Sequence, residues 1–171
     1  MRSLRPTRRQ VLTIGSLTTI GVGLGGFLWL PAAAEGRQVL SSGELSVVGA
    51  LGEVFFPTGN AIGLSWSDIG LEEEVDRLLG ETLDPKLVPP FRYLLRFMQY
   101  GTVAETGKRF TACSVERRAA LLENWGRPGS KIRGGGIASL KSVLGMAYFN
   151  HPDVLNAIGW RSYCAVKPGS A

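Results

Sequence analysis

Beyond residue 40, apolar residues recur at every third or fourth position, the spacing of helices that bury one face. Stretches rich in glycine and proline separate these segments. The expected helices cover about 41–56, 67–80, 84–101, 114–125, 130–148 and 150–158. No run alternates apolar and polar residues for long enough to predict a strand. The pattern therefore predicts an all-α fold, with five or six short helices in one small domain.

Local signals set the expected helix ends. Ser41 and Glu44 have the spacing of a capping box, and Ser114 is placed to cap the fourth helix. Gly80 is expected to end the second helix. The run Gly134–Gly136 weakens the early turns of the fifth helix, at about 1 kcal/mol per glycine relative to alanine, and indicates a kink or a close packing contact.

A basic and then apolar segment precedes the helical domain. Arginines stand at positions 2, 5, 8 and 9, and no acidic residue occurs before Glu35. Without residues 1–34 the chain has 15 basic and 14 acidic residues, so its high isoelectric point comes mostly from this segment. The charge is therefore poor support for nucleic-acid binding, which needs a basic surface on the folded domain.

The segment 1–34 has the layout of an export signal, with an uncharged apolar stretch over 11–30 and a small-residue exit at Ala32–Ala34. Thr7, Arg8 and Arg9, followed by Gln10, resemble the twin-arginine motif, which directs folded cargo across the bacterial inner membrane. We expect a twin-arginine signal peptide that is cleaved after Ala34. The alternative is a retained membrane anchor, since about 20 apolar residues can span a bilayer.

The remaining chain, 35–171, offers few chemical groups. One histidine and two cysteines are too few for a zinc site, an iron–sulfur cluster or a bis-histidine haem. His151 beside Asp153 could move protons, but its place before Pro152 favours a helix-capping role. Glu72–Glu74 is interpreted as a solvated helix face. We therefore expect no catalytic residue, no metal site and no cofactor site in this chain.

Four aromatic residues recur at helical spacing in the third predicted helix. They are Phe91, Tyr93, Phe97 and Tyr100. Such a stripe could line a ligand pocket, but core and interface packing is the favoured interpretation.

Several segments, taken in order, resemble the gluconate 2-dehydrogenase subunit 3 family, the small subunits of glucose–methanol–choline-type flavin dehydrogenases. The matching segments are Thr7–Arg9, Leu40–Ser41, Glu53–Pro57, Phe110, Ser114–Arg117, Gly145–Phe149, His151–Pro152 and Ile158–Gly159. The tail 161–169 resembles the C-terminal stretch of the related small subunit of bacterial FAD-dependent sugar dehydrogenases. The resemblance implies a subunit without a cofactor that binds a large FAD-containing dehydrogenase subunit, with a haem c cytochrome as a possible third member. It also implies that the small subunit supplies the export signal for that complex, which would lie in the periplasm at the cytoplasmic membrane.

The two cysteines matter in such an oxidising compartment, where disulfides persist. Cys113 and Cys164 could pair within the chain. The favoured alternative makes Cys113 a small buried apolar residue and places Cys164 at the partner surface, as a contact or in a disulfide with a partner cysteine. Trp160 and Tyr163 beside it are residue types that anchor interfaces, so the tail from about 160 is the predicted contact.

Three hypotheses follow for the whole chain. The leading one is an accessory subunit that escorts a flavin dehydrogenase of sugars, sugar acids or alcohols through the twin-arginine translocase. The second is a free-standing enzyme, which the lack of a catalytic constellation disfavours. The third is a membrane-anchored scaffold or binding protein of the cell envelope with no dehydrogenase partner.

Overall fold

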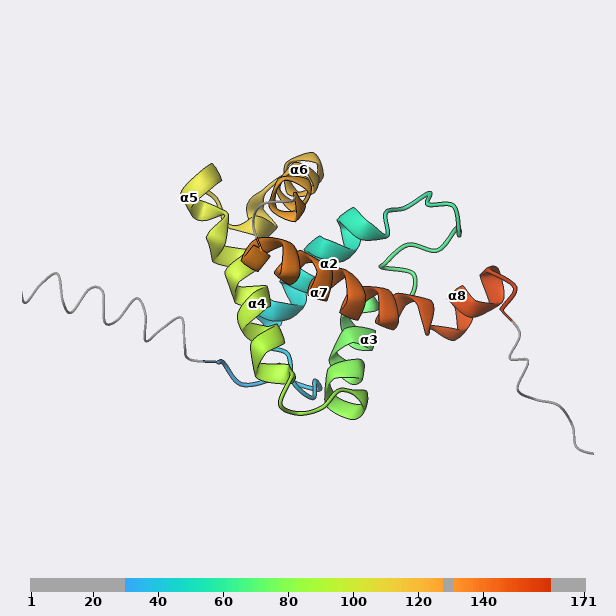
Figure 1. Cartoon of the computed structure of the whole chain (residues 1–171). Helices are drawn as coiled ribbons and strands as arrows, with labels where there is room; N and C mark the ends of the chain where they lie inside the picture. Colours follow the sequence, from blue (N-terminus) through green and yellow to red (C-terminus); the bar gives the residue numbers. More distant parts are fainter. Residues whose placement is uncertain (1–29, 128–130, 161–171) are drawn as a thin grey trace, which may run out of the picture. The chain divides into compact units, whose positions relative to one another are not determined.

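The structure is a computed structural model that describes residues 30–127 and 131–160 (Figure 1). Every regular element in these two ranges is helical, which confirms the all-α class. The elements are α2 (Ser42–Phe55), α3 (Leu71–Arg77), η1 (Leu78–Thr82), α4 (Val88–Gly101), α5 (Val103–Thr106), η2 (Phe110–Ala112), α6 (Val115–Gly126), α7 (Lys131–Phe149) and α8 (Pro152–Ala157). The expected signal helix in 1–34 lies almost wholly outside the described residues. None of the described helices is long and apolar enough to cross a membrane.

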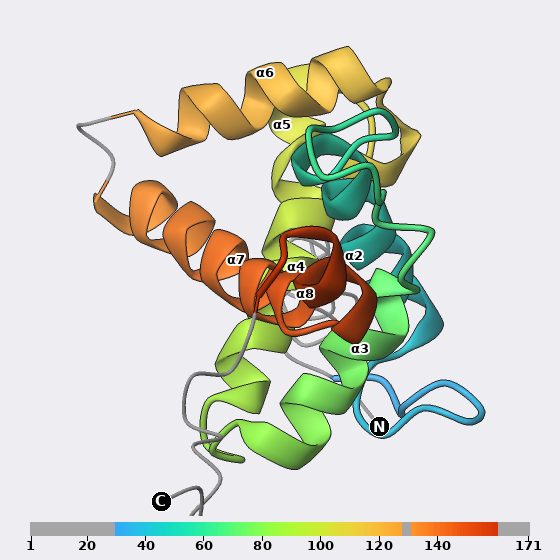
Figure 2. The ribbon, with the colours of Figure 1, turned by 90° about the vertical axis from the view of Figure 1, so that its right-hand side faces the viewer.

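Helix α2 lies at the centre of the domain and packs against α3, α4, α6 and α7 (Figure 2). Its glycines make this possible, because Gly49 and Gly52 face neighbouring side chains at very short range. A Cβ atom at Gly52 would lie 2.8 Å from Leu71 and 2.9 Å from Trp66. The absence of side chains at these positions therefore lets α3 and the segment before it lie directly on α2.

Helix α7 closes the core from the other side, packing against α6 and α3. The fully buried side chains include large residues from each long helix: Leu51, Leu71, Leu95, Trp125, Leu140, Leu144 and Tyr148. The ring of Tyr148 stacks on Phe56 with centroids 4.0 Å apart, and its hydroxyl donates to the carbonyl of Leu64 at 2.5 Å. This pair joins the end of α7 to the loop that follows α2.

The predicted ends of the second helix are wrong at both termini. Helix α3 begins at Leu71, because Asp68 accepts hydrogen bonds from the backbone N–H and hydroxyl of Ser65 and so closes a turn. Gly70 then adopts a left-handed φ of 59°, which a helix interior does not allow. At the other end, Gly80 lies inside the π-helical turn η1 instead of ending the helix.

The other predicted helices lie close to their expected ranges. Ser41 caps α2, Ser114 caps α6 through a hydrogen bond from the N–H of Arg117, and the two prolines of α4 lie in its first turn. The short helices α5 and η2 were not predicted, since residues 102–112 show no clear apolar period. Of the three glycines near the start of α7, Gly136 makes the close contact that the run suggested, at 2.9 Å between its virtual Cβ and Leu94.

A candidate partner-binding surface

A groove lies between α4 and α7, and its lining is almost entirely apolar. It encloses about 460 Å³ and is open to solvent along one side. Helix α4 and the turn before it supply Leu83, Leu87, Pro90, Phe91 and Leu94, and α7 supplies Ala138, Ser139, Ser142, Val143 and Met146. The hydroxyls of Ser139 and Ser142 are the main polar groups in this wall.

The packing of the two helices explains why the groove exists. Helix α4 packs mainly on α2, whereas α7 packs mainly on α6 and α3. The two helices meet where Leu94 lies against Gly136. In the groove lining α7 then supplies Ala138, Ser139 and Ser142, whose small side chains leave space beside α4. At the rim, Leu87 is 55% exposed and Met146 is 43% exposed. Contiguous exposed apolar surface of this kind marks sites where proteins bind other proteins or ligands.

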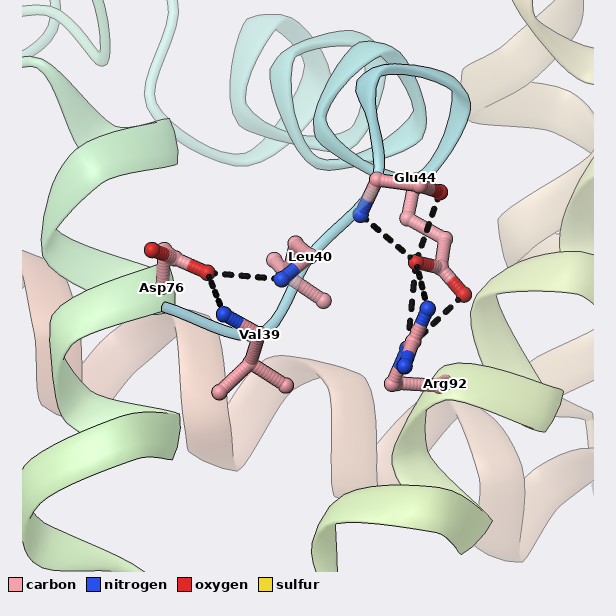
Figure 3. Close-up of polar contacts among 6 residues, drawn as sticks. Val39, Leu40, Glu44, Asp76 and Arg92 are labelled. Atoms are coloured by element: carbon pink, nitrogen blue, oxygen red, sulfur yellow. Dashed lines mark hydrogen bonds and ion pairs between the residues drawn. The ribbon is translucent and has the colours of Figure 1, made fainter. Parts of the chain in front are cut away.

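Three polar contacts join helices of the domain, and the sequence predicted only one part of them, the capping box of Ser41 and Glu44. The first contact joins residues 38–40 to α3. The Asp76 carboxylate accepts the backbone N–H groups of Val39 and Leu40 (Figure 3), at 3.0 and 2.7 Å, and also that of Gln38 at 2.7 Å. A carboxylate that gathers several backbone donors makes charge-assisted hydrogen bonds, which are the strong ones. Asp76 therefore fixes the chain just before α2.

The second contact lies at the start of α2. Glu44 accepts hydrogen bonds from the N–H and hydroxyl of Ser41, which is the predicted capping box, and it also binds Arg92 of α4 (Figure 3). The shortest of the Arg92 distances is 2.9 Å, and the Glu44 side chain is almost fully buried. The carboxylate that caps α2 thus also positions the helix that forms one wall of the groove.

The third contact is made by Arg118 of α6, which is buried although arginine is usually exposed. Its guanidinium donates to the carbonyl oxygens of Ala50 and Cys113, at 2.7 and 3.1 Å, and to Glu53 at 2.7 Å. Each of the three guanidinium nitrogens has an acceptor, so three hydrogen bonds compensate the buried charge. This contact joins α6 to α2.

The acidic run in α3 is also not the solvated face that the sequence suggested. Only Glu73 is exposed, where it binds Arg37 at 2.6 Å. Glu74 binds Arg77, whereas Glu72 is half-buried against α2. A Cβ atom at Gly49 would lie 2.5 Å from Glu72 Oε1. Burial raises the pKa of Glu72 above its ordinary value.

The structure places only some of the predicted site residues. Arg8, Arg9, Tyr163 and Cys164 lie outside the described residues. Trp160 is at the end of the described chain, where its side chain is 65% exposed. Cys113 is buried, with its sulfur 3.5 Å from the carbonyl oxygen of Arg109, as the apolar interpretation expects.

His151 has the capping role that its sequence context favoured. It is the N-cap of α8, and its Nδ1 accepts a hydrogen bond from the backbone N–H of Asp153 at 3.3 Å. The Asp153 carboxylate lies 3.8 Å from the same nitrogen and is exposed. Within residues 30–127 and 131–160, no three histidine, cysteine or acidic side chains are placed to hold a metal ion.

The aromatic residues of α4 divide between core and surface. Phe91 is buried and forms part of the groove floor, and Phe97 packs against Trp125 with centroids 5.6 Å apart. Tyr100 is exposed, with the guanidinium of Arg109 5.5 Å from the centre of its ring. The core part of the favoured interpretation, core and interface packing, agrees with Phe91 and Phe97. The interface part stays a prediction.

Comparison with known proteins finds no relative. No family model, no curated protein and no solved structure matches the chain. The resemblance to the gluconate 2-dehydrogenase subunit 3 family therefore remains a prediction from the sequence segments.

Proposed function

We propose that this chain is the non-catalytic small subunit of a periplasmic or membrane-associated FAD-dependent dehydrogenase of sugars, sugar acids or alcohols. In this proposal it binds the flavin subunit and escorts it through the twin-arginine translocase. The groove between α4 and α7 is the observation that carries the binding role. The twin-arginine motif and the resemblance of the helical segments support the export route and the kind of partner.

The polar groups of the domain are consistent with a binding role. Three buried charged side chains bind backbone groups or an opposite charge inside the domain. They are Asp76, Glu44 and Arg118. The described surface also carries exposed apolar side chains for a partner to bury, among them the groove rim and Trp160 ahead of the predicted contact tail. A few buried side chains, with tryptophan, tyrosine and arginine enriched among them, supply most of the energy of typical interfaces.

The partner subunit would supply the redox chemistry. This chain would bind that subunit and supply the export signal. Two proteins that associate after folding in the cytoplasm can cross the membrane on one signal. A flavin that is inserted before export explains why the twin-arginine route serves such a complex.

The test is to purify the tagged chain from bacterial envelope fractions and record a visible spectrum together with the composition of the preparation. The proposal expects a flavin spectrum from a co-purifying subunit. A second preparation carries Arg8→Lys and Arg9→Lys, with Arg2→Lys and Arg5→Lys as the matched control. We expect the flavin subunit to remain in the cytoplasm when Arg8 and Arg9 are substituted, and to reach the periplasm in the control.

Three results would contradict the proposal. Delivery of the flavin subunit to the periplasm in spite of the Arg8 and Arg9 substitutions would exclude the escort role. A colourless preparation without a partner would exclude the dehydrogenase complex and favour the envelope scaffold. Turnover of substrate by the isolated chain would exclude the accessory role itself.

A further inference from the structure

The bond at which signal peptidase is expected to cut lies inside a closed loop of the folded domain. The backbone N–H of Ala34 donates to the carbonyl oxygen of Leu40 at 2.9 Å, and the carbonyl oxygen of Ala34 accepts from the N–H of Arg37 at 3.0 Å. Gly36, the third residue of that turn, has a φ of 72°, the conformation that a type II turn requires there. The Ala34–Glu35 peptide bond is therefore part of a tight turn.

Side-chain contacts fix this N-terminal loop, residues 34–40, to the rest of the domain. Leu40 is fully buried, and Asp76 accepts the N–H groups of the last three loop residues. Gln38 also donates to Glu81 at 2.9 Å. It lies so close to Gly80 that a Cβ atom there would be 2.0 Å from Gln38 Oε1. The N-terminal loop therefore packs on the π-helical turn η1, where the glycine leaves room for the side chain of Gln38.

A protease binds its substrate as an extended strand, with the backbone groups on both sides of the scissile bond paired to the enzyme. Here the backbone groups of Ala34 are paired within the chain, and the residues that follow turn back on themselves. Cleavage requires the loop to open, and its rate then follows the population of the open form. That population is small when a buried leucine and a carboxylate with three donors oppose opening.

We infer that the fold shields the Ala34–Glu35 bond from signal peptidase, so that the exported chain keeps its N-terminal segment and remains on the membrane. This inference reverses the preference for cleavage that the Ala32–Ala34 sequence gave. It rests on the proposed export in the cell, because only an exported chain meets the peptidase there. The direct test below needs no export and can fail separately.

The test uses purified full-length chain in detergent with purified signal peptidase. One variant carries a flexible Gly/Ser insertion of about ten residues between Glu35 and Gly36, which moves the bond away from the loop. The contacts of Asp76 and Leu40 stay available in this variant. We expect the insertion variant to be cut after Ala34 about tenfold faster than the wild type, or more. The matched control carries the same insertion after Gly59, an exposed turn, and should be cut as slowly as the wild type.

The envelope of producing cells gives the second readout. Intact mass should show wild-type chain that still contains residues before Ala34 and stays in the membrane pellet after a carbonate wash. The insertion variant should begin at Glu35 and be released. Wild-type chain that begins at Glu35, or an insertion variant cut no faster than wild type by the purified peptidase, would overturn the inference. Failure of the Arg8 and Arg9 test leaves the result with purified components unaffected.

Discussion

The carboxylate of Asp76 accepts a hydrogen bond from the backbone N–H of Leu40 at 2.7 Å, and the side chain of Leu40 is fully buried. This one contact joins the segment that follows the predicted export signal to α3, ahead of the first long helix. Because the same carboxylate also binds the N–H groups of Gln38 and Val39, its loss leaves several donors without an acceptor at once. The start of the folded domain therefore depends on an acidic residue in α3.

Asp76→Ala is expected to lower the free energy of unfolding by about 2–4 kcal/mol, because hydrogen bonds to charged groups contribute about 1.5–3 kcal/mol and buried N–H groups would lose their acceptor. Urea denaturation followed by circular dichroism measures the change. Asp84→Ala is the matched control, since Asp84 is exposed and its carboxylate accepts the N–H of Lys86, two residues further along the chain. A loss at Asp76 no larger than at Asp84 would show that the loop contributes little to stability.

Arg118→Met is expected to destabilise the domain by about 3–5 kcal/mol, the range for removing one partner of a buried, hydrogen-bonded charge. The carbonyl oxygens of Ala50 and Cys113 would lose their donor. Glu53→Gln should cost less than about 1 kcal/mol, because the Glu53 side chain is 42% exposed and water can replace the interaction. Thermal unfolding of Arg118→Met and Glu53→Gln measures these two effects, and Arg117→Met, at the exposed neighbouring position, is the control. Equal effects at Arg117 and Arg118 would contradict it.

A helix could be predicted from the sequence where the period of its apolar residues and its capping residue indicate the same start. Ser41 with Glu44, and Ser114, gave the starts of α2 and α6 because the capping interaction is local. The predicted start of the second helix, at 67–68, was wrong because of another local interaction. The Asp68 carboxylate closes a turn on Ser65 before the helix begins.

The groove and its supports could not be predicted in this way. They depend on contacts between residues far apart in the sequence, such as Arg92 with Glu44 and Arg118 with Ala50. The helical period does not mark Arg118 as buried, because a buried arginine has no sequence signal until its acceptors are known. The run Gly134–Gly136 was a local clue, since it predicted a kink or a close packing contact, and Gly136 lies against Leu94 of α4.

Glu72→Gln is expected to raise the melting temperature more at pH 7 than at pH 4. Burial raises the pKa of Glu72 in the folded state, so the folded chain holds this proton more tightly than the unfolded chain does. Stability therefore falls as the pH rises from the unfolded pKa through the raised folded pKa, and the amide removes that loss. Calorimetry across pH 4–7 measures the difference.

Glu116→Gln is the control of opposite sign. Backbone and Ser114 hydrogen bonds at the start of α6 lower the pKa of Glu116. Its contribution to stability is present above the unfolded pKa and is lost as the pH falls through the lowered folded pKa. The substitution should therefore lower the melting temperature at pH 7 and have less effect at low pH. Parallel pH profiles for Glu72→Gln and Glu116→Gln would refute both assignments.

Gly135→Ala and Gly52→Ala are expected to change stability in opposite directions. A Cβ atom at Gly135 meets nothing within 4 Å, so alanine there should stabilise α7 by about 0.5–1 kcal/mol through its higher helix propensity. At Gly52 the new atom would press on Leu71 and on the Cβ of Trp66, and overpacking of this kind costs about 1–3 kcal/mol. Chemical denaturation of both variants tests the pair. Stabilisation by Gly52→Ala would show that α2 and α3 are not closely packed.

Leu87→Glu and Met146→Glu are each expected to weaken binding of the proposed flavin subunit by about tenfold or more. The reason is that an unpaired carboxylate would be buried in an apolar interface. This burial costs at least the ~1.4 kcal/mol that a tenfold change in affinity represents. Both side chains lie at the groove rim and are substantially exposed, so the fold should tolerate the changes. Val103→Glu is the matched control: Val103 is 42% exposed, close to the 43% of Met146, and belongs to α5 outside the groove lining. Co-purification of the flavin subunit with each tagged variant, normalised to the amount of folded chain, measures the effect. Retention of the partner by both groove variants at the level of Val103→Glu would move the binding surface away from α4 and α7 and leave the exposed Trp160 as the remaining described contact.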